Sequence, residues 1–208
     1  MARGTALLSA AAAAGALLAG CGNGAGGDTA QAGDAEAARI AASPSTLTQD
    51  QTERKRLIPA AKKGWEQALR AAVATVPKSE LVSIKLKGPA DRPRWKTEVV
   101  TADGAAHTVR VDAVTGKAGK AQAETDQDAD DKQELAGWLK KATVTPQQAA
   151  QTATDKTKGT VTAVKLDDSD GGTPTWSVDV VSTDDWNKTT YDIDATNRKV
   201  LREHVDRD

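Results

Sequence analysis

The sequence predicts an α+β protein with two tandem small domains, each a helix packed on an antiparallel sheet of three to four strands. Residues 93–100 and 174–181 share a pattern in which Trp follows Pro by two residues and opens a strict alternation. A period of two places alternate side chains on one face of a strand. An amphipathic helix and a Val/Leu-rich strand precede each Trp strand, so the chain beyond residue 50 contains one unit twice.

Matched positions of the two units keep an almost constant spacing. The spacing is 80 residues between Leu86 and Leu166 and 81 between Trp95 and Trp176. It is 82 between Val111 and Ile193. Each one-residue increase falls in a loop or turn, which is where a duplicated fold tolerates insertions.

Composition limits the classes of function. The 208 residues carry 28 basic and 29 acidic side chains, a net charge of −1, and no long basic block, so nucleic acid is not an expected ligand. With no Phe and one Tyr, the core has to be built from Val, Leu, Ile, Ala and five Trp. A single Cys excludes an internal disulfide and an all-Cys metal site.

That single Cys closes an N-terminal targeting segment. Arg3 is a minimal positive region, residues 6–18 are an apolar stretch short for a bilayer span, and Leu18-Ala19-Gly20-Cys21 follows. The pattern is typical of a bacterial lipobox, so residues 1–20 are predicted to be a lipoprotein signal peptide and Cys21 the lipidated N-terminus. An ordinary secretory signal and a short membrane anchor are the alternatives. Two acyl chains are enough for stable anchoring.

Residues 21–46 are predicted to be the lipidated Cys and a flexible tether. They contain mainly Gly, Ala, Ser, Asp and Gln without apolar periodicity. A random coil of this length reaches roughly 30 Å, which would hold the folded part clear of lipid headgroups.

Residues 47–120 are predicted to form the first domain. An apolar face over 65–76 predicts a helix that ends at Pro77, and residues 48–61 predict an earlier helix started or kinked at Pro59. Three strands follow. They are expected at 81–86, at the Trp95 segment and at 107–111, with turns at Asp103-Gly104 and at Gly116, which is free to take a positive φ.

Residues 121–133 are predicted to be an acidic linker that also caps the next helix. The run from Asp126 to Asp130 is similar to the start of a calcium loop. However, Asp131 stands where that loop needs Gly, and Gly137 stands where it needs a bidentate Glu.

Residues 134–208 are predicted to form the second domain. A helix carries Leu135, Trp138, Leu139 and Ala142 on one face. A second helix begins with a capping box at Thr145 and Pro at its first position. Strands are expected at 161–166, 175–181 and 189–194, with 199–203 as a fourth.

These residues together resemble the PepSY domain over roughly 57–120 and 138–206. The resemblance includes its last motif, Val111-Asp112-Ala113-Val114-Thr115-Gly116-Lys117. The second copy, residues 193–199, lacks the turn Gly, although Asn197 tolerates a left-handed backbone. The resemblance implies a helix against a curved antiparallel sheet, a location outside the membrane, and a role in restraining or assisting peptidases. No binding residue carries over from the family.

The chain contains no recognisable catalytic constellation, and no catalytic, cofactor-binding or metal-binding residue is predicted. His107 and His204 are expected to be structural or solvated, since nothing marks a nucleophile beside them. Asp167, Asp168 and Asp170 crowd a loop before Gly171-Gly172. That loop is either a weak divalent-cation site or a turn with solvated carboxylates.

Trp186 is the one Trp without a core explanation. It lies between Asp185 and Asn187 at a predicted hairpin tip, and the first copy has no aromatic residue there. Trp is common in binding hot spots, so Trp186 is predicted to contact a partner. The alternative is that its ring folds back over the sheet edge or the neighbouring domain.

The sequence therefore predicts a lipid-anchored extracytoplasmic binding module that is not an enzyme and has no cofactor. Its expected partners are the membrane, through Cys21, and a protein or peptide outside the cytoplasm. The first function considered is to restrain or assist a cell-envelope peptidase. The alternatives are an accessory or sensory lipoprotein that scaffolds a membrane complex and, more distantly, an enzyme of unrecognised type.

Overall fold

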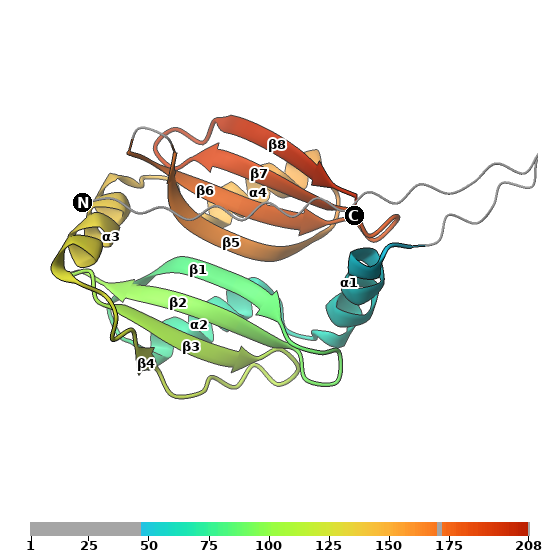
Figure 1. Cartoon of the computed structure of the whole chain (residues 1–208), viewed down its shortest axis with the longest axis horizontal. Helices are drawn as coiled ribbons and strands as arrows, with labels where there is room; N and C mark the ends of the chain where they lie inside the picture. The colour runs from blue at the N-terminus through green and yellow to red at the C-terminus, as the bar shows by residue number, and fades with distance from the viewer. Residues whose placement is uncertain (1–46, 170–171, 208) are drawn as a thin grey trace, which may run out of the picture. The chain divides into compact units, whose positions relative to one another are not determined.

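The computed structural model describes residues 47–169 and 172–207, all of which belong to one compact unit. The predicted signal peptide, Cys21 and the tether lie outside the described residues. A single antiparallel sheet of eight strands in the order β4-β3-β2-β1-β5-β6-β7-β8 runs through this unit (Figure 1). Its strands are β1 Ser79–Lys87, β2 Arg94–Thr101, β3 Ala106–Asp112, β4 Gln122–Ala123, β5 Thr160–Ser169, β6 Thr173–Val181, β7 Lys188–Asp194 and β8 Val200–Asp206.

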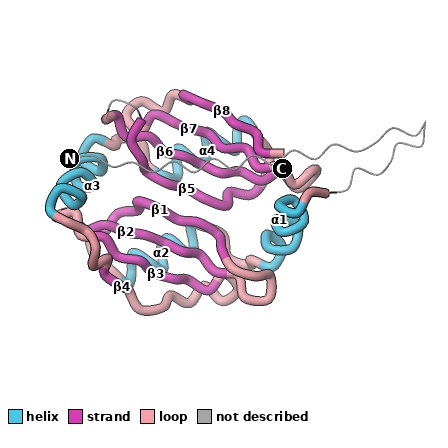
Figure 2. Tube along the Cα trace, in the orientation of Figure 1, coloured by secondary structure: helices cyan, strands magenta, loops and turns pink. Residues whose placement is uncertain are grey.

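Four helices accompany the sheet (Figure 2). They are α1 Gln49–Ala60, α2 Trp65–Thr75, α3 Ala129–Lys141 and α4 Pro146–Lys156. Thr48, Asp128 and Thr145 begin α1, α3 and α4 with capping boxes, in which the side chain of the cap accepts from the backbone three residues on. The predicted class, two units each with helix on antiparallel sheet, is confirmed.

The helix predicted to start or kink at Pro59 instead begins ten residues earlier. Its capping box at Thr48 satisfies the first backbone N–H groups, and Pro59 falls in the last turn. The helix ends at Ala60, one residue beyond Pro59. Pro therefore removes a hydrogen bond only where the helix is already ending.

The two faces of the sheet differ in what covers them. On one face, here called the core face, α2 and α4 pack over the predicted apolar sets of β2 and β6. Trp95 is 1% exposed and Trp176 is 2% exposed, which confirms the assigned face. The opposite face, here called the open face, carries the polar partners in the alternation, such as Lys96, Glu98 and Ser177.

The two repeats meet at the antiparallel pair of β1 and β5. Ile84 lies opposite Val164, and these residues are equivalent at a spacing of 80. Both strands also contain a bulge at equivalent places, between Leu81 and Ser83 and between Val161 and Ala163. The repeats are thus related by an approximate two-fold axis through the centre of the sheet.

The first helix of each repeat contacts the other repeat, and the two helices lie at opposite ends of the sheet (Figure 1). From α1, Gln51 Nε2 donates to Asn187 Oδ1 at 2.8 Å, and Arg54 donates to the carbonyl of Trp186 at 3.1 Å. From α3, the partly buried Leu135 and Leu139 pack on an apolar cluster of the first repeat. That cluster comprises Val82, Val100 and Ala106, and Val100 points to the open face.

The predicted linker is partly ordered. Within residues 121–133, β4 pairs with β3, and Gln127 Nε2 donates to the carbonyl of Gly104 at 2.8 Å. Asp128 accepts from the backbone N–H groups of Asp130 and Asp131, as the predicted cap requires. The domain boundary at 121–133 stays a prediction.

The motif turns confirm one backbone expectation and correct another. Gly116 has a φ of 78°. In the second repeat the left-handed residue is Arg198, with a φ of 69°, and not Asn197. Arg198 lies 82 residues after Gly116, so it is the true equivalent, and Asn197 instead donates its side-chain amide to Asp194 at 2.8 Å.

Candidate binding pocket

The two core Trp residues make the same hydrogen bond in both repeats. Trp95 Nε1 donates to the carbonyl of Lys63 at 2.8 Å, and Trp176 Nε1 donates to the carbonyl of Val144 at 2.7 Å. Each bond ties the segment before α2 or α4 to the sheet. These rings are therefore structural, since a buried indole N–H needs an acceptor.

The motif turns hold the same segments from the other side. The backbone N–H groups of Lys62 and Lys63 both donate to the carbonyl of Ala113 at 2.8 Å. In the second repeat, Thr143 and Val144 donate to Ala195 at 2.9 and 2.8 Å. The residues that carry the family resemblance thus position helix against sheet.

An apolar pocket of about 580 Å³ lies beside this framework, between α2 and the connection from α3 to α4. Pockets of this size accommodate small ligands or peptide side chains. The lining is mainly aliphatic, with Trp176 at its base. The lining residues are Leu69, Arg70, Val73, Ala74, Glu80, Leu81, Leu139, Ala142, Thr143, Val144, Thr145, Pro146, Gln147 and Trp176.

The α2 residues that line this pocket differ from the residues at the equivalent positions of the second repeat. Helix α2 presents Leu69 and Val73, one turn apart, and the equivalent positions in α4 are Ala150 and Thr154. Pro146 starts α4 on the far side of the pocket, because a capping box with Pro at the first helical position sets its first turn.

Arg70 and Glu80 give the apolar pocket a charged rim. Both are exposed, and among the described residues Arg70 forms no ion pair. A guanidinium in this position can pair with a carboxylate of a ligand whose apolar group enters the pocket. Among the described residues that line the pocket there is neither His nor Cys.

Trp186 lies away from this pocket, in the turn between β6 and β7. Its φ is 61°, and its backbone N–H donates to the carbonyl of Ser182 at 3.1 Å. Gly104 is the equivalent residue in the first repeat. Its φ is 87°, and its backbone N–H donates to the carbonyl of Thr101. Trp186 therefore supplies the left-handed residue of a turn that Gly makes elsewhere.

The premise that Trp186 is exposed and out of reach of the core is wrong. Its side chain is partly buried and packs against the main hydrophobic core, and Arg54 of α1 donates to its carbonyl. In the same turn, the N–H of Asn187 lowers the pKa of Asp185 by stabilising its charged form. That Trp186 contacts a partner stays a prediction.

The other candidate chemical groups remain apart. Lys165 forms an ion pair with Asp167, and Asp170 lies outside the described residues. Within 47–169 and 172–207, no three His, Cys, Asp or Glu side chains gather closely enough to hold a metal ion. His107 is on β3 and His204 is on β8, near opposite edges of the sheet.

Residues 66–118 and 143–204 match the PepSY family, described as the peptidase propeptide and YPEB domain. Together these segments cover more than half of the chain. The chain belongs to the PepSY family. Each matched PepSY segment contains a core helix and the strands that follow it, whereas α1 and α3 lie outside both matches.

Two solved structures are similar over 70% of the chain. One is a Clostridium difficile protein provisionally described as a lipoprotein, at 20% identity, a TM-score of 0.42 and coverage of 94% of that protein. The other is the YpmB protein from Bacillus subtilis, at 15% identity, a TM-score of 0.30 and full coverage of that protein. Among curated proteins, none gives a significant match. Of the helices described, none has the length and apolar character needed to cross a membrane.

Proposed function

We propose that this PepSY protein is a lipid-anchored, extracytoplasmic module that binds a protein or peptide partner and catalyses no reaction. The observation that carries the proposal is the apolar pocket beside α2, with the unpaired Arg70 at its rim. Such a site supports binding of an aliphatic or aromatic side chain near a carboxylate.

The anchor in this proposal is a diacylglyceryl group on Cys21. Its support is the segment Leu18-Ala19-Gly20-Cys21 and the roughly 30 Å reach of residues 21–46. Cys21→Ala should release the protein from the membrane fraction of cells. A variant that stays membrane-bound at the wild-type level would show that the anchor is something else.

The partner in this proposal is a cell-envelope peptidase, which the module restrains or assists. The description of the family as a peptidase propeptide domain supports this choice. The test is a photocrosslinking residue at Ala74, an exposed position on the pocket rim, in intact cells. A matched probe at the exposed Lys158, which does not line the pocket, is the control.

The proposal expects a peptidase adduct from Ala74 that disappears when Val73→Glu places a charge in the pocket. A sensor kinase or transporter subunit in that adduct would instead support the accessory or sensory lipoprotein. Adducts at Lys158 with none at Ala74 would overturn the assignment of the pocket.

A further inference from the structure

Five basic side chains gather on the open face of the first repeat. They come from three neighbouring strands and are all exposed; together they are here called the basic ladder, Lys85 and Lys87 of β1, Arg94 and Lys96 of β2, and Arg110 of β3. The strand register places Lys85 opposite Lys96 and Lys96 opposite Arg110. Lys87 likewise lies opposite Arg94.

This arrangement costs stability within the chain itself. Like charges directly opposite each other on adjacent strands are destabilising, and none of the five makes an ion pair with a described residue. On this face Asp112 lies opposite Arg94, and the carboxylate two residues after Lys96 is Glu98. Its pKa is raised by burial and by Glu124, although Lys96 and Lys165 act in the opposite direction.

The second repeat shows that the fold does not require these cations. The five equivalent positions carry one cation, two neutral residues and two acids. In the order of the ladder they are Lys165, Asp167, Thr175, Ser177 and Asp192. Because both repeats form the same sheet with the same bulges, the basic ladder is a property of the first repeat alone and points to a ligand.

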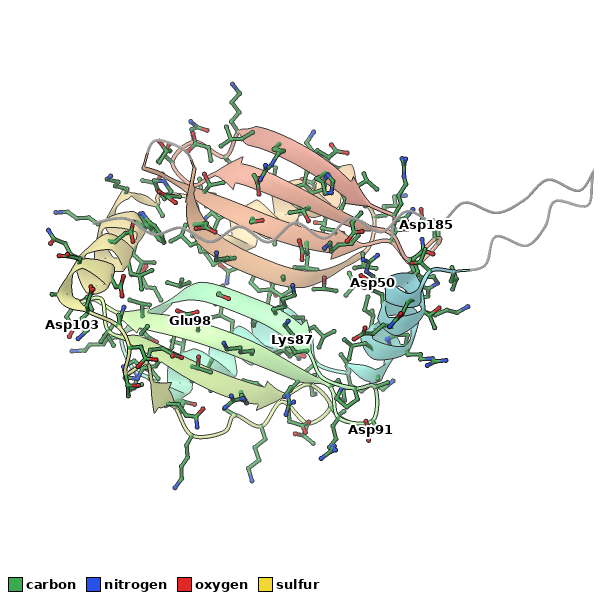
Figure 3. The ribbon with its side chains drawn as sticks, in the orientation of Figure 1. Asp50, Lys87, Asp91, Glu98, Asp103 and Asp185 are labelled. Atoms are coloured by element: carbon green, nitrogen blue, oxygen red, sulfur yellow. The ribbon has the colours of Figure 1, made fainter. Side chains whose placement is uncertain are left out.

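The ladder continues into a second cavity, of about 310 Å³, between α1 and the open face. Lys85 and Lys87 line it together with the apolar Leu57, Ile58 and Leu86, and the carboxylates of Asp50, Glu53 and Asp179 line it as well. Figure 3 shows Lys87 at the end of β1 that faces α1. A cavity with an apolar part and an acidic part therefore adjoins a row of cations that form no ion pair with a described residue.

We propose that the basic ladder and this cavity bind an acidic peptide segment. One apolar side chain of the peptide enters the cavity, and its carboxylates pair with Lys85, Lys96 and Arg110. This site lies on the opposite face of the sheet from the apolar pocket beside α2, so the inference goes beyond the proposed function and is tested separately.

A flat anionic membrane fits the same surface less well. Helix α3 packs on an apolar cluster that includes Val100 of the open face, and α1 lines the cavity beside Lys85 and Lys87. On the half of this face made by the second repeat, Asp167 pairs with Lys165 and Asp192 pairs with Arg202, so the unpaired cations of the ladder lie on the first repeat alone. A short peptide can cover the basic half alone.

The test uses the purified full chain with Cys21→Ala and a fluorescein-labelled decapeptide of Glu with one central Leu, followed by fluorescence anisotropy. In the ladder variant, four cations are replaced by the residue types found at the equivalent positions of the second repeat. The substitutions are Lys87→Asp, Arg94→Thr, Lys96→Ser and Arg110→Asp. The matched control makes the same change in charge at exposed positions elsewhere: Lys158→Asp, Lys199→Asp, Lys140→Ser and Lys156→Ser.

The ladder variant should weaken binding by about tenfold or more, whereas the control should stay within about twofold. Replacing the Leu of the probe by Gly should weaken binding by about threefold or more, because the cavity then gains no apolar contact. Thermal unfolding checks that both variants fold; if the ladder variant does not, Lys96→Ser alone should weaken binding by about threefold.

Three results would overturn the proposal. The first is no measurable binding of the probe by the wild-type chain. The second is an equal loss in the ladder variant and the control, which would mean unspecific charge attraction. The third is tighter binding to phosphatidylglycerol vesicles than to the peptide, lost in the ladder variant, which would assign the surface to a membrane.

Discussion

Trp95 and Trp176 hold equivalent positions and close equivalent hydrogen bonds, to Lys63 and Val144. Replacing either by Ala should lower the free energy of unfolding by about 3–5 kcal/mol, through the cavity left in the core. The corresponding Phe variants keep most of the ring contacts and lose the N–H donor, so they should cost less. Denaturant unfolding followed by circular dichroism measures both; an Ala variant as stable as wild type would contradict the assigned role.

Asp194 links stability to pH. It accepts from the backbone N–H and hydroxyl of Thr196 at 2.7 and 2.6 Å and from the side-chain amide of Asn197, and these bonds lower its pKa. A lowered folded-state pKa stabilises the fold above the ordinary value of 3.8, and that contribution is lost as pH falls through the folded pKa.

Asp194→Ala should therefore lower the free energy of unfolding by about 1 kcal/mol at pH 7. The difference from wild type should shrink below pH 3.8. Denaturant unfolding at pH 7 and pH 3 measures it. Asp184→Ala, in an exposed turn, is the control and should change stability by less than about 0.5 kcal/mol at either pH. If Asp194→Ala lowers the free energy of unfolding equally at both pH values, the charge of the Asp194 carboxylate does not stabilise the fold.

Trp186 combines a stabilising ring with an unfavourable backbone. Trp186→Ala should destabilise the protein, because the partly buried ring packs on the core while Ala keeps the φ of 61°. Trp186→Gly should be more stable than Trp186→Ala by about 1 kcal/mol, since Gly takes that conformation freely. Thermal unfolding of the two variants separates the contribution of the ring from that of the backbone. If Trp186→Gly is no more stable than Trp186→Ala, the turn carries no backbone strain.

At the scale of elements, α1 is held to the second repeat largely by Arg54. Its guanidinium donates to Asp206 at 2.9 Å and to the carbonyl of Trp186, and its side chain is 14% exposed. Arg54→Ala should cost about 1–3 kcal/mol and speed amide hydrogen exchange in α1 while leaving α2 unchanged. Lys55→Ala, its exposed neighbour, should change neither. Equal exchange in wild type and Arg54→Ala would show that apolar contacts alone hold α1.

At the scale of the whole molecule, two features join the repeats: the β1–β5 strand pair, and the contacts that α1 and α3 each make with the other repeat. A specific protease site introduced at Thr125–Asp126, within the predicted linker, should cut the chain into halves that stay together on size exclusion. The same site placed in residues 21–46 controls for loss of the tether. Halves that elute separately and stay folded would show that each repeat is an independent domain.

Much of the fold can be predicted from the sequence because it is local. The period of two around Trp95 and Trp176 predicts their buried face, the apolar spacing over 65–76 predicts α2, and the repeated spacing predicts two like units. Each of these signals depends on neighbours within one element. The family resemblance follows from the same local patterns.

The candidate sites could not be predicted in this way. The apolar pocket joins α2 to residues about 70 positions later, and the basic ladder exists only because strand register sets Lys85, Lys96 and Arg110 side by side. Alternation indicates that each cation faces solvent, but it says nothing of which residue lies opposite. The packing of the Trp186 ring on the core could not be predicted either, because the turn that carries it contacts a helix of the other repeat.

By itself, the sequence determined the elements, the buried face of each Trp strand and the duplication, since periodicity and turn chemistry act within a few residues. Only the tertiary structure decided that β1 pairs with β5, that α1 and α3 each contact the other repeat, and which side chains share a pocket or a ladder. Helix α1 has almost no apolar stripe to indicate its partner. Its place depends on contacts with residues more than 130 positions away, such as Gln51 with Asn187 and Arg54 with Asp206, and these contacts require both repeats to be folded together.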